Sequence, residues 1–226
     1  MIPWVHLDTS PIPGETASLR LMRRGDEFAI VVDSIELMNS RRSGSERALA
    51  SLACGRLREC RRPRVLIGGL GMGFTLRAAL DELAPDAEVV VAELVPAVVA
   101  WARGPLAHLF AGRLDDPRVT LRETDVHHVI DRGPGAYDAI LLDVDNGPEG
   151  LVQQTNDRLY DVAGLGRAHR ALKPGGLLGV WSERPDRKFK SRLQRGGFTV
   201  EEHKVRSAGS GGRHVVWIGE KAAAPR

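Results

Sequence analysis

Residues 65–80 read VLIGGLGMGFTLRAAL, and this stretch decides the fold. The apolar run at its start is typical of a buried strand, and Gly69, Gly71 and Gly73 are typical of a tight turn into a helix. Glycine lets the backbone approach a ligand closely, and the helix that follows offers unpaired N–H groups. The turn therefore favours a nucleotide-like ligand. A glycine turn alone is a weak signal, so the rest of the chain has to decide.

From this stretch onward, strand-like and helix-like patterns alternate. The expected strands are 65–68, 87–94, 118–124, 137–144, 177–183, 198–205 and 214–221, and the expected helices are 73–83, 96–104, 126–133, 157–172 and 186–195. This alternation predicts an α/β, Rossmann-like, doubly wound and mostly parallel seven-stranded sheet. The glycines at 209–212 are expected to turn the chain back, so that the last two strands form a hairpin with one antiparallel strand.

The N-terminal segment is expected to be a small β appendage. Residues 17–24 and 27–38 are strand-like, and the Gly25-Asp26 pair between them is typical of a turn.

A helix is expected to link this appendage to the main sheet. Ser43 is followed three positions later by Glu46, which matches a capping box, and Pro63 ends the helical pattern. We place the boundary near residue 60, which divides the chain into an N-terminal appendage with its linking helix, 1–60, and a nucleoside-binding domain, 61–222.

The composition is that of a globular protein. Of the 226 residues, 42% are hydrophobic and 27% are charged, and no apolar run is long enough to span a bilayer. The N-terminus lacks a signal sequence, so we expect a cytoplasmic protein without a membrane partner. Two cysteines provide no disulfide framework, and the scattered histidines show no metal-ligand spacing, so no metal is expected.

Arginines gather in one short segment, and the formal net charge is +3. The cluster consists of Arg56, Arg58, Arg61, Arg62 and Arg64. Such a run could contact phosphates, but no aromatic residues are interleaved with it, and a solvated helix end accounts for it as well. Nucleic acid is therefore a disfavoured partner.

Acidic residues follow three of the expected strands. Glu93 ends the second strand, Asp125 follows the third, and Asp143 and Asp145 end the fourth. Ligands of a doubly wound sheet bind outside the carboxyl ends of its strands, so these residues and the glycine turn are expected at one rim.

Each position has a chemical role and a structural alternative. Glu93 lies about twenty residues beyond Gly73, where a carboxylate can accept both hydroxyls of a ribose. Asp125, with Val126 beside it in the predicted cofactor-binding set, can accept from an exocyclic amine such as that of adenine. The alternatives are ordinary turn glycines, a strand-end carboxylate, and a helix N-cap at Asp125. Together and in this order, the residues favour a nucleoside site.

The spacing of the glycines excludes two familiar nucleotide sites. Gly69-x-Gly71-x-Gly73 differs from the G-x-G-x-x-G of dinucleotide-binding domains, and no Lys-Ser/Thr pair follows it as in a P-loop.

These features resemble the class I S-adenosylmethionine-dependent transferases, to which ALKPGGLLGV (171–180) is also similar. The closer resemblance is to the polyamine aminopropyltransferases, the spermidine synthase family. It rests on the N-terminal β appendage, on LIGGLGMGFTLR (66–77) and on YDAILLDVDNGPEG (137–150), and it covers most of residues 17–184.

The resemblance implies a transferase of polyamine biosynthesis that moves an aminopropyl group from decarboxylated S-adenosylmethionine to a small-molecule amine. Glu93 would bind the ribose, Asp125 would lie at the adenine, and Asp143 would take a proton from the attacking amine. Asp143 and Asp145 together could attract a cationic amine, and their mutual repulsion should raise one pKa. Pairing through the N-terminal β region would give a homodimer.

Two positions depart from the relatives. Met72 stands where the family has an aspartate that holds the donor's amine end, and Ile67 stands where many methyltransferases have an acid. The donor is therefore either decarboxylated or intact S-adenosylmethionine. A methyltransferase is the alternative function, and a non-catalytic nucleoside- or RNA-binding module is a third.

Overall fold

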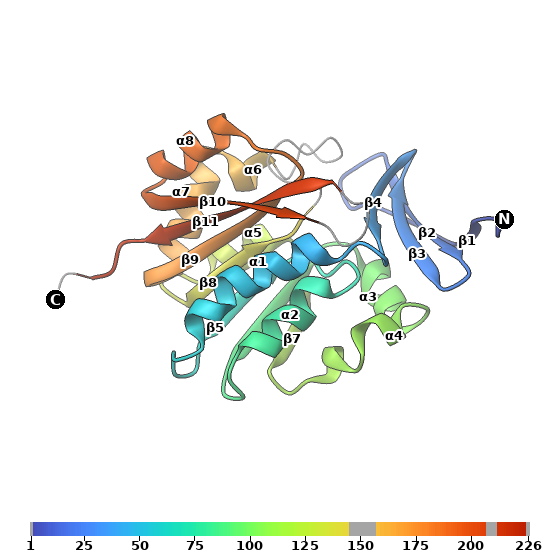
Figure 1. Ribbon diagram of the computed structural model, residues 1–226, viewed down its shortest axis with the longest axis horizontal. Helices are drawn as coiled ribbons and strands as arrows, with labels where there is room; N and C mark the ends of the chain where they lie inside the picture. The colour runs from blue at the N-terminus through green and yellow to red at the C-terminus, as the bar shows by residue number, and fades with distance from the viewer. Residues whose placement is uncertain (1, 145–156, 207–211, 225–226) are drawn as a thin grey trace.

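Two β-sheets organise the chain, a four-stranded sheet from the N-terminal segment and a seven-stranded sheet from the rest (Figure 1). This computed structural model describes residues 2–144, 157–206 and 212–224. Among these residues, no helix combines the length and the apolar character needed to cross a bilayer.

The N-terminal sheet is an antiparallel meander in the order β1-β2-β3-β4. Its strands are β1 (Val5–Pro11), β2 (Ser18–Arg24), β3 (Glu27–Val32) and β4 (Ile35–Asn39). The prediction of one strand over 27–38 was wrong, because the chain turns at Asp33, whose φ is 50°. Strand β1 was not predicted, because almost all of its side chains are exposed and it therefore lacks an apolar alternation.

The seven-stranded sheet has the order β10-β11-β9-β8-β5-β6-β7. Its strands are β5 (Arg64–Gly68), β6 (Glu88–Glu93), β7 (Val119–Glu123), β8 (Tyr137–Leu142), β9 (Leu172–Ser182), β10 (Phe198–Arg206) and β11 (Arg213–Lys221). All neighbours pair in parallel except β11, which is antiparallel to both β9 and β10. The predicted fold class is confirmed. Chain order reverses between β5 and β8, which is where ligands bind in such sheets.

Helices cover both faces of this sheet. They are α1 (Gly44–Cys54), α2 (Phe74–Glu82), α3 (Pro96–Arg103), α4 (Ala107–Phe110), α5 (Val126–Asp131), α6 (Asp157–Tyr160), α7 (Val162–Ala171) and α8 (Arg187–Arg195). One apolar core contains residues of α1, α2 and α3, and a second contains residues of α5, α7 and α8. Val65 and Ile67 of β5 belong to the first core and Leu66 to the second, so both faces of the strand are buried and its sequence is continuously apolar.

The prediction of one helix over 157–172 was wrong. Asp161 leaves the helical conformation, and its carboxylate accepts a hydrogen bond from the Gly164 N–H at 2.6 Å, so α7 begins there as a separate helix. Strand β9 begins at Leu172, earlier than the expected 177. The predicted glycine turn at 209–212 lies mostly outside the described residues.

Helix α1 starts where the capping box predicts it, but by other contacts. Ser43 is the N-cap residue and its side chain makes no capping hydrogen bond. Glu46 instead accepts a hydrogen bond from the Ser45 hydroxyl at 2.7 Å. The prediction of a capping box between Ser43 and Glu46 was therefore wrong. Leu49 of α1 lies in the same core as Ile67 of β5, and the domain boundary near residue 60 stays a prediction.

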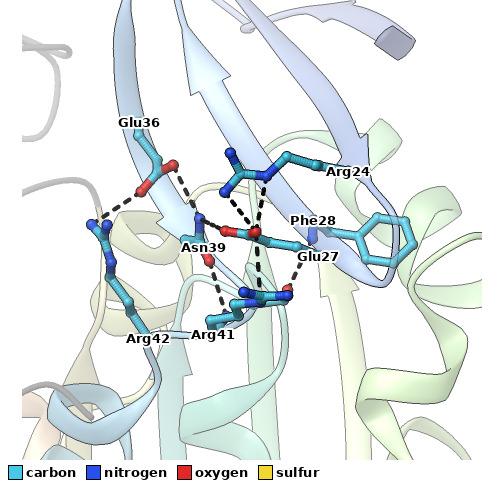
Figure 2. Close-up of polar contacts among 8 residues, drawn as sticks. Arg24, Glu27, Phe28, Glu36, Asn39, Arg41 and Arg42 are labelled. Atoms are coloured by element: carbon cyan, nitrogen blue, oxygen red, sulfur yellow. Dashed lines mark hydrogen bonds and ion pairs between the residues drawn. The ribbon is translucent and has the colours of Figure 1, made fainter. Parts of the chain in front are cut away.

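A polar cluster holds the connection between β4 and α1 (Figure 2). The buried Glu27 accepts from Arg24 at 2.8 Å and from the Asn39 side-chain amide at 3.0 Å, and these bonds lower the pKa of Glu27. Asn39 also donates to Glu36 and accepts from the Arg41 N–H. The cluster fixes the end of β4 and, with it, the path of the chain into α1.

Candidate active site

A cleft of about 950 Å³, including its opening to solvent, lies at the carboxyl ends of the central strands. Its lining comes from both sheets. The described residues that line it are Leu19, Ile30, Leu37, Met38, Glu46, Gly69, Gly71, Ala92, Glu93, Leu94, Val95, Val98, Asp125, Val126, Asp143, Val144 and Trp181. The structure thus brings the predicted Glu93, Asp125 and Asp143 together with the glycine turn.

The three glycines of the turn differ in their surroundings. All have positive φ, with values of 90° at Gly69, 48° at Gly71 and 77° at Gly73. Gly69 and Gly71 line the cleft, whereas Gly73 does not. A Cβ at Gly73 would collide with the ring of Phe110, so packing and backbone conformation account for this glycine.

Glu93 fixes the glycine turn from the end of β6. It is buried, and its two carboxylate oxygens accept from the N–H groups of Leu70 and Val95, both at 2.8 Å. Burial raises the pKa of Glu93, and these backbone hydrogen bonds oppose that rise. The N–H groups of Gly71 and Leu94 also interact with this carboxylate, so Glu93 holds the backbone of the glycine turn and of the segment after β6 in place.

Asp125 is the N-cap residue of α5 and also lines the cleft. Its Oδ1 accepts from the His127 N–H at 2.9 Å, so the capping alternative is realised. Among the described residues, this capping bond engages only Oδ1. Val126 follows it at the start of α5, lines the cleft beside it, and is buried.

Asp143 follows β8 at the centre of the cleft. Its Oδ2 accepts from the Thr75 hydroxyl at 2.5 Å, and its N–H donates to the Gly68 carbonyl at 3.0 Å. Burial, and secondly the charge of Glu46, raise the pKa of Asp143 to about 7, while the hydrogen bond from Thr75 lowers it. The expected repulsion between Asp143 and Asp145 stays a prediction, because Asp145 lies outside the described residues.

Glu46 is the one acid in the described lining of the cleft that was not predicted as a site residue from the sequence. It lies in the first turn of α1, its exposed fraction is 8%, and burial raises its pKa. Its backbone carbonyl lies 3.5 Å from the Thr75 hydroxyl oxygen, which also contacts Asp143. A capping box and a cleft acid use the same residue types, so no local pattern distinguishes the two.

Met72 and Ile67 contribute no polar side chain to the cleft. Both are fully buried in the apolar core. The Met72 N–H lies 3.0 Å from the sulfur of Met38, which lines the cleft from β4 beside Gly71.

The charge of the cleft selects among ligands. Its described lining contains acids and no lysine, arginine or histidine. Pyrophosphate therefore finds no cation there, whereas apolar walls with acids fit a purine nucleoside that carries a positive charge. No group of three histidine, cysteine or acidic residues that could hold a metal occurs among the described residues.

The arginine cluster forms ion pairs with acids of neighbouring elements. Arg56 pairs with Glu201 at 2.6 Å, Arg58 with Glu82, and Arg64 with Glu88 at 3.1 Å. The positive charge of these three side chains is thus compensated within the protein.

Solved structures with this architecture define the class of protein. Spermidine synthase from Thermotoga maritima superposes with a TM-score of 0.73 at 19% identity, over 97% of this chain and 74% of that one. A spermidine synthase in complex with the transition state analogue AdoDATO gives 0.72 at 19% identity, over 97% and 73%. A methyltransferase from Burkholderia thailandensis with bound S-adenosylhomocysteine gives 0.57 at 19% identity, over 79% and 78%. The chain therefore has the fold of spermidine synthase, and the methyltransferase shares its main features.

Sequence relatives define the family, although no protein-family model matches the chain. The polyamine aminopropyltransferase of Mycobacterium tuberculosis is 33% identical over 173 residues, which are 72% of this chain and 30% of the relative. Polyamine aminopropyltransferase 2 of Pseudomonas aeruginosa is 34% identical over 120 residues, which are 51% of this chain and 32% of the relative. The chain belongs to the spermidine synthase, or polyamine aminopropyltransferase, family. It spans about a third of the length of the curated relatives it matches.

Proposed function

We propose that this chain transfers an aminopropyl group from decarboxylated S-adenosylmethionine to a small-molecule amine, with Asp143 as the proton acceptor. The observation that carries the proposal is the convergence of Glu93, Asp125 and Asp143 on one cleft beside the glycine turn. Family membership supports the reaction class.

The adenosyl group of the donor would lie between β5 and the start of α5. Glu93, which lines the cleft at the end of β6, would accept the ribose hydroxyls. Asp125 would accept from the adenine amine, and Val126 and Leu94 would contact the ring. These contacts would orient the donor in the cleft.

Asp143 has the properties of a general base for this reaction. A primary amine is protonated at neutral pH and has no lone pair to attack with until it loses a proton. A pKa of about 7 suits Asp143 to hold the ammonium and accept that proton near neutral pH. The amine then forms the new C–N bond, and the electrons of the broken C–S bond stay on sulfur, which leaves as methylthioadenosine.

The assay follows both donors. Purified protein is incubated with putrescine and either decarboxylated or intact S-adenosylmethionine, and the nucleoside products are separated by chromatography. We expect methylthioadenosine from the decarboxylated donor. Release of S-adenosylhomocysteine from the intact donor, with none of the expected product, would favour the methyltransferase alternative and overturn the proposal.

We also propose that two copies pair through the N-terminal sheet. Support comes from the large apolar side chains exposed on and before β1, namely Ile2, Val5 and Leu7. Light scattering of the purified chain tests this: a monomer mass at micromolar concentration would contradict it.

A further inference from the structure

We propose that Glu46 binds the terminal ammonium of the donor's aminopropyl chain and makes the cleft prefer the decarboxylated donor over intact S-adenosylmethionine. This inference rests on the proposed function and assigns a specificity-determining residue to it. It starts from the position of Glu46, in the first turn of α1 and on the wall of the cleft that contains Asp143.

Glu46 is a buried acid without a cationic partner among the described residues. Its exposed fraction is 8%, and the only side chain seen to donate to it is the hydroxyl of Ser45. A buried carboxylate without a counter-charge is costly, and a bound cation would offset that cost. The Glu46 carboxylate meets the backbone N–H groups of Ser45 and Glu46 in the first turn of α1, but it forms no reciprocal capping box, because the side chain of Ser43 makes no capping bond. Neither of these contacts supplies a positive charge.

The other acids of the cleft have different positions. Glu93 holds the glycine turn at the end of β6, and Asp125 caps α5. The backbone carbonyl of Glu46 lies 3.5 Å from the hydroxyl of Thr75, which also contacts Asp143. The charge of the Glu46 side chain is near enough to raise the pKa of Asp143. Of the four acids in the described lining, Glu46 and Asp143 are therefore the pair placed to receive the reacting end of the donor.

The donor tail needs such a group. Decarboxylated S-adenosylmethionine ends in a primary ammonium, which has three hydrogens to donate and no acceptor. Met72 and Ile67 offer it nothing, since both are buried in the apolar core. One ammonium can interact with the carboxylates of both Glu46 and Asp143, and its positive charge reduces the repulsion between them.

Intact S-adenosylmethionine carries an additional α-carboxylate at the same end. No lysine, arginine or histidine is present in the described lining of the cleft to hold it. The carboxylate would instead enter a space that already contains two acids. Like charges at short range in a site shielded from water repel strongly, so the intact donor should bind more weakly.

The test measures binding by calorimetry to the wild-type chain and to Glu46→Gln. The ligands are decarboxylated S-adenosylmethionine, intact S-adenosylmethionine, and methylthioadenosine, which lacks the ammonium tail. We expect Glu46→Gln to weaken the decarboxylated donor by about tenfold or more, because a charged hydrogen bond is lost. Methylthioadenosine should bind within about twofold of wild type, since the adenosyl contacts are unchanged. The preference for the decarboxylated over the intact donor should fall.

Controls separate binding from folding. Glu202→Gln makes the same change at an exposed position of β10 outside the described lining and should alter no affinity. Glu46→Asp keeps the charge and should retain part of the preference. Equal weakening of the decarboxylated donor and methylthioadenosine, or an unchanged donor affinity, would overturn the inference. If Glu46→Gln acts as expected but no amine yields methylthioadenosine in the wild type, only the proposed function fails.

Discussion

The hydroxyl of Thr75 donates a hydrogen bond to Asp143, and the same oxygen lies 3.5 Å from the backbone carbonyl of Glu46. Through this one buried side chain, α2 contacts both the loop after β8 and the first turn of α1. Asp143 and the first turn of α1 are therefore both in contact with a residue that belongs to neither segment. The bond to Thr75 also stabilises the ionised form of Asp143.

Thr75→Val should move the acidic limb of the pH–rate profile to higher pH. Valine keeps the shape of threonine but removes the donor that lowers the pKa of Asp143. The base is then ionised only at higher pH, so kcat/KM at pH 7 falls. The measurement is kcat/KM against pH, which reports the free enzyme. Thr75→Ser keeps the hydroxyl and serves as the control; an unshifted limb in the valine variant would exclude this role.

Glu46→Gln should move the same limb in the opposite direction. The negative charge of Glu46 raises the pKa of Asp143, so an uncharged side chain lets Asp143 ionise at lower pH. The acidic limb of kcat/KM for the amine is recorded at a saturating donor concentration, so that weaker donor binding does not affect it. A limb at higher pH in Glu46→Gln would contradict the coupling between the two acids.

Asp143→Asn should stabilise the fold at alkaline pH. The folded-state pKa of Asp143, about 7, lies above its ordinary value of 3.8, so the folded chain holds a proton that the unfolded chain has lost. The stability of the wild type therefore falls as pH rises through this window and levels off above pH 7. Asparagine removes that dependence. Thermal unfolding at pH 5 and pH 8 should show a gain in Tm for the variant that is larger at pH 8, and an equal or smaller gain there would refute the assignment.

Gly73→Ala should destabilise the chain more than Gly175→Ala. Both glycines have φ of 77°, but a Cβ at Gly175 meets open space whereas one at Gly73 collides with the buried ring of Phe110. The left-handed backbone alone costs an alanine about 1–2 kcal/mol. Overpacking against Phe110 adds about 1–3 kcal/mol. Urea unfolding of both variants measures the difference, and equal losses would show that the ring yields without cost.

The fold could be predicted wherever the buried residues of an element form a recognisable apolar pattern in the sequence. β5 and β8 are buried on both faces, and their segments 65–68 and 139–142 contain no polar side chain. β1 has no apolar pattern, because almost all of its side chains are exposed. The break between α6 and α7 depends on one aspartate that accepts from a backbone N–H, which the helical pattern on either side conceals.

Three of the cleft acids could be predicted from the same sheet. Glu93, Asp125 and Asp143 follow strands, and the topology of a doubly wound sheet places such positions at one rim. Glu46 could not be found in this way, because α1 precedes the sheet in sequence and reaches the cleft only through tertiary packing. The wall provided by Leu37 and Met38 of β4 depends in the same way on how the N-terminal sheet packs.

The most direct measurement compares turnover and binding in Asp143→Asn. Methylthioadenosine release from decarboxylated S-adenosylmethionine and an amine gives the rate, and calorimetry with methylthioadenosine gives the nucleoside affinity. We expect turnover to be abolished while this affinity stays nearly intact, because the proposed adenosyl contacts come from Glu93, Asp125 and Val126. A variant that turns over at the wild-type rate would contradict the assignment of Asp143 as proton acceptor.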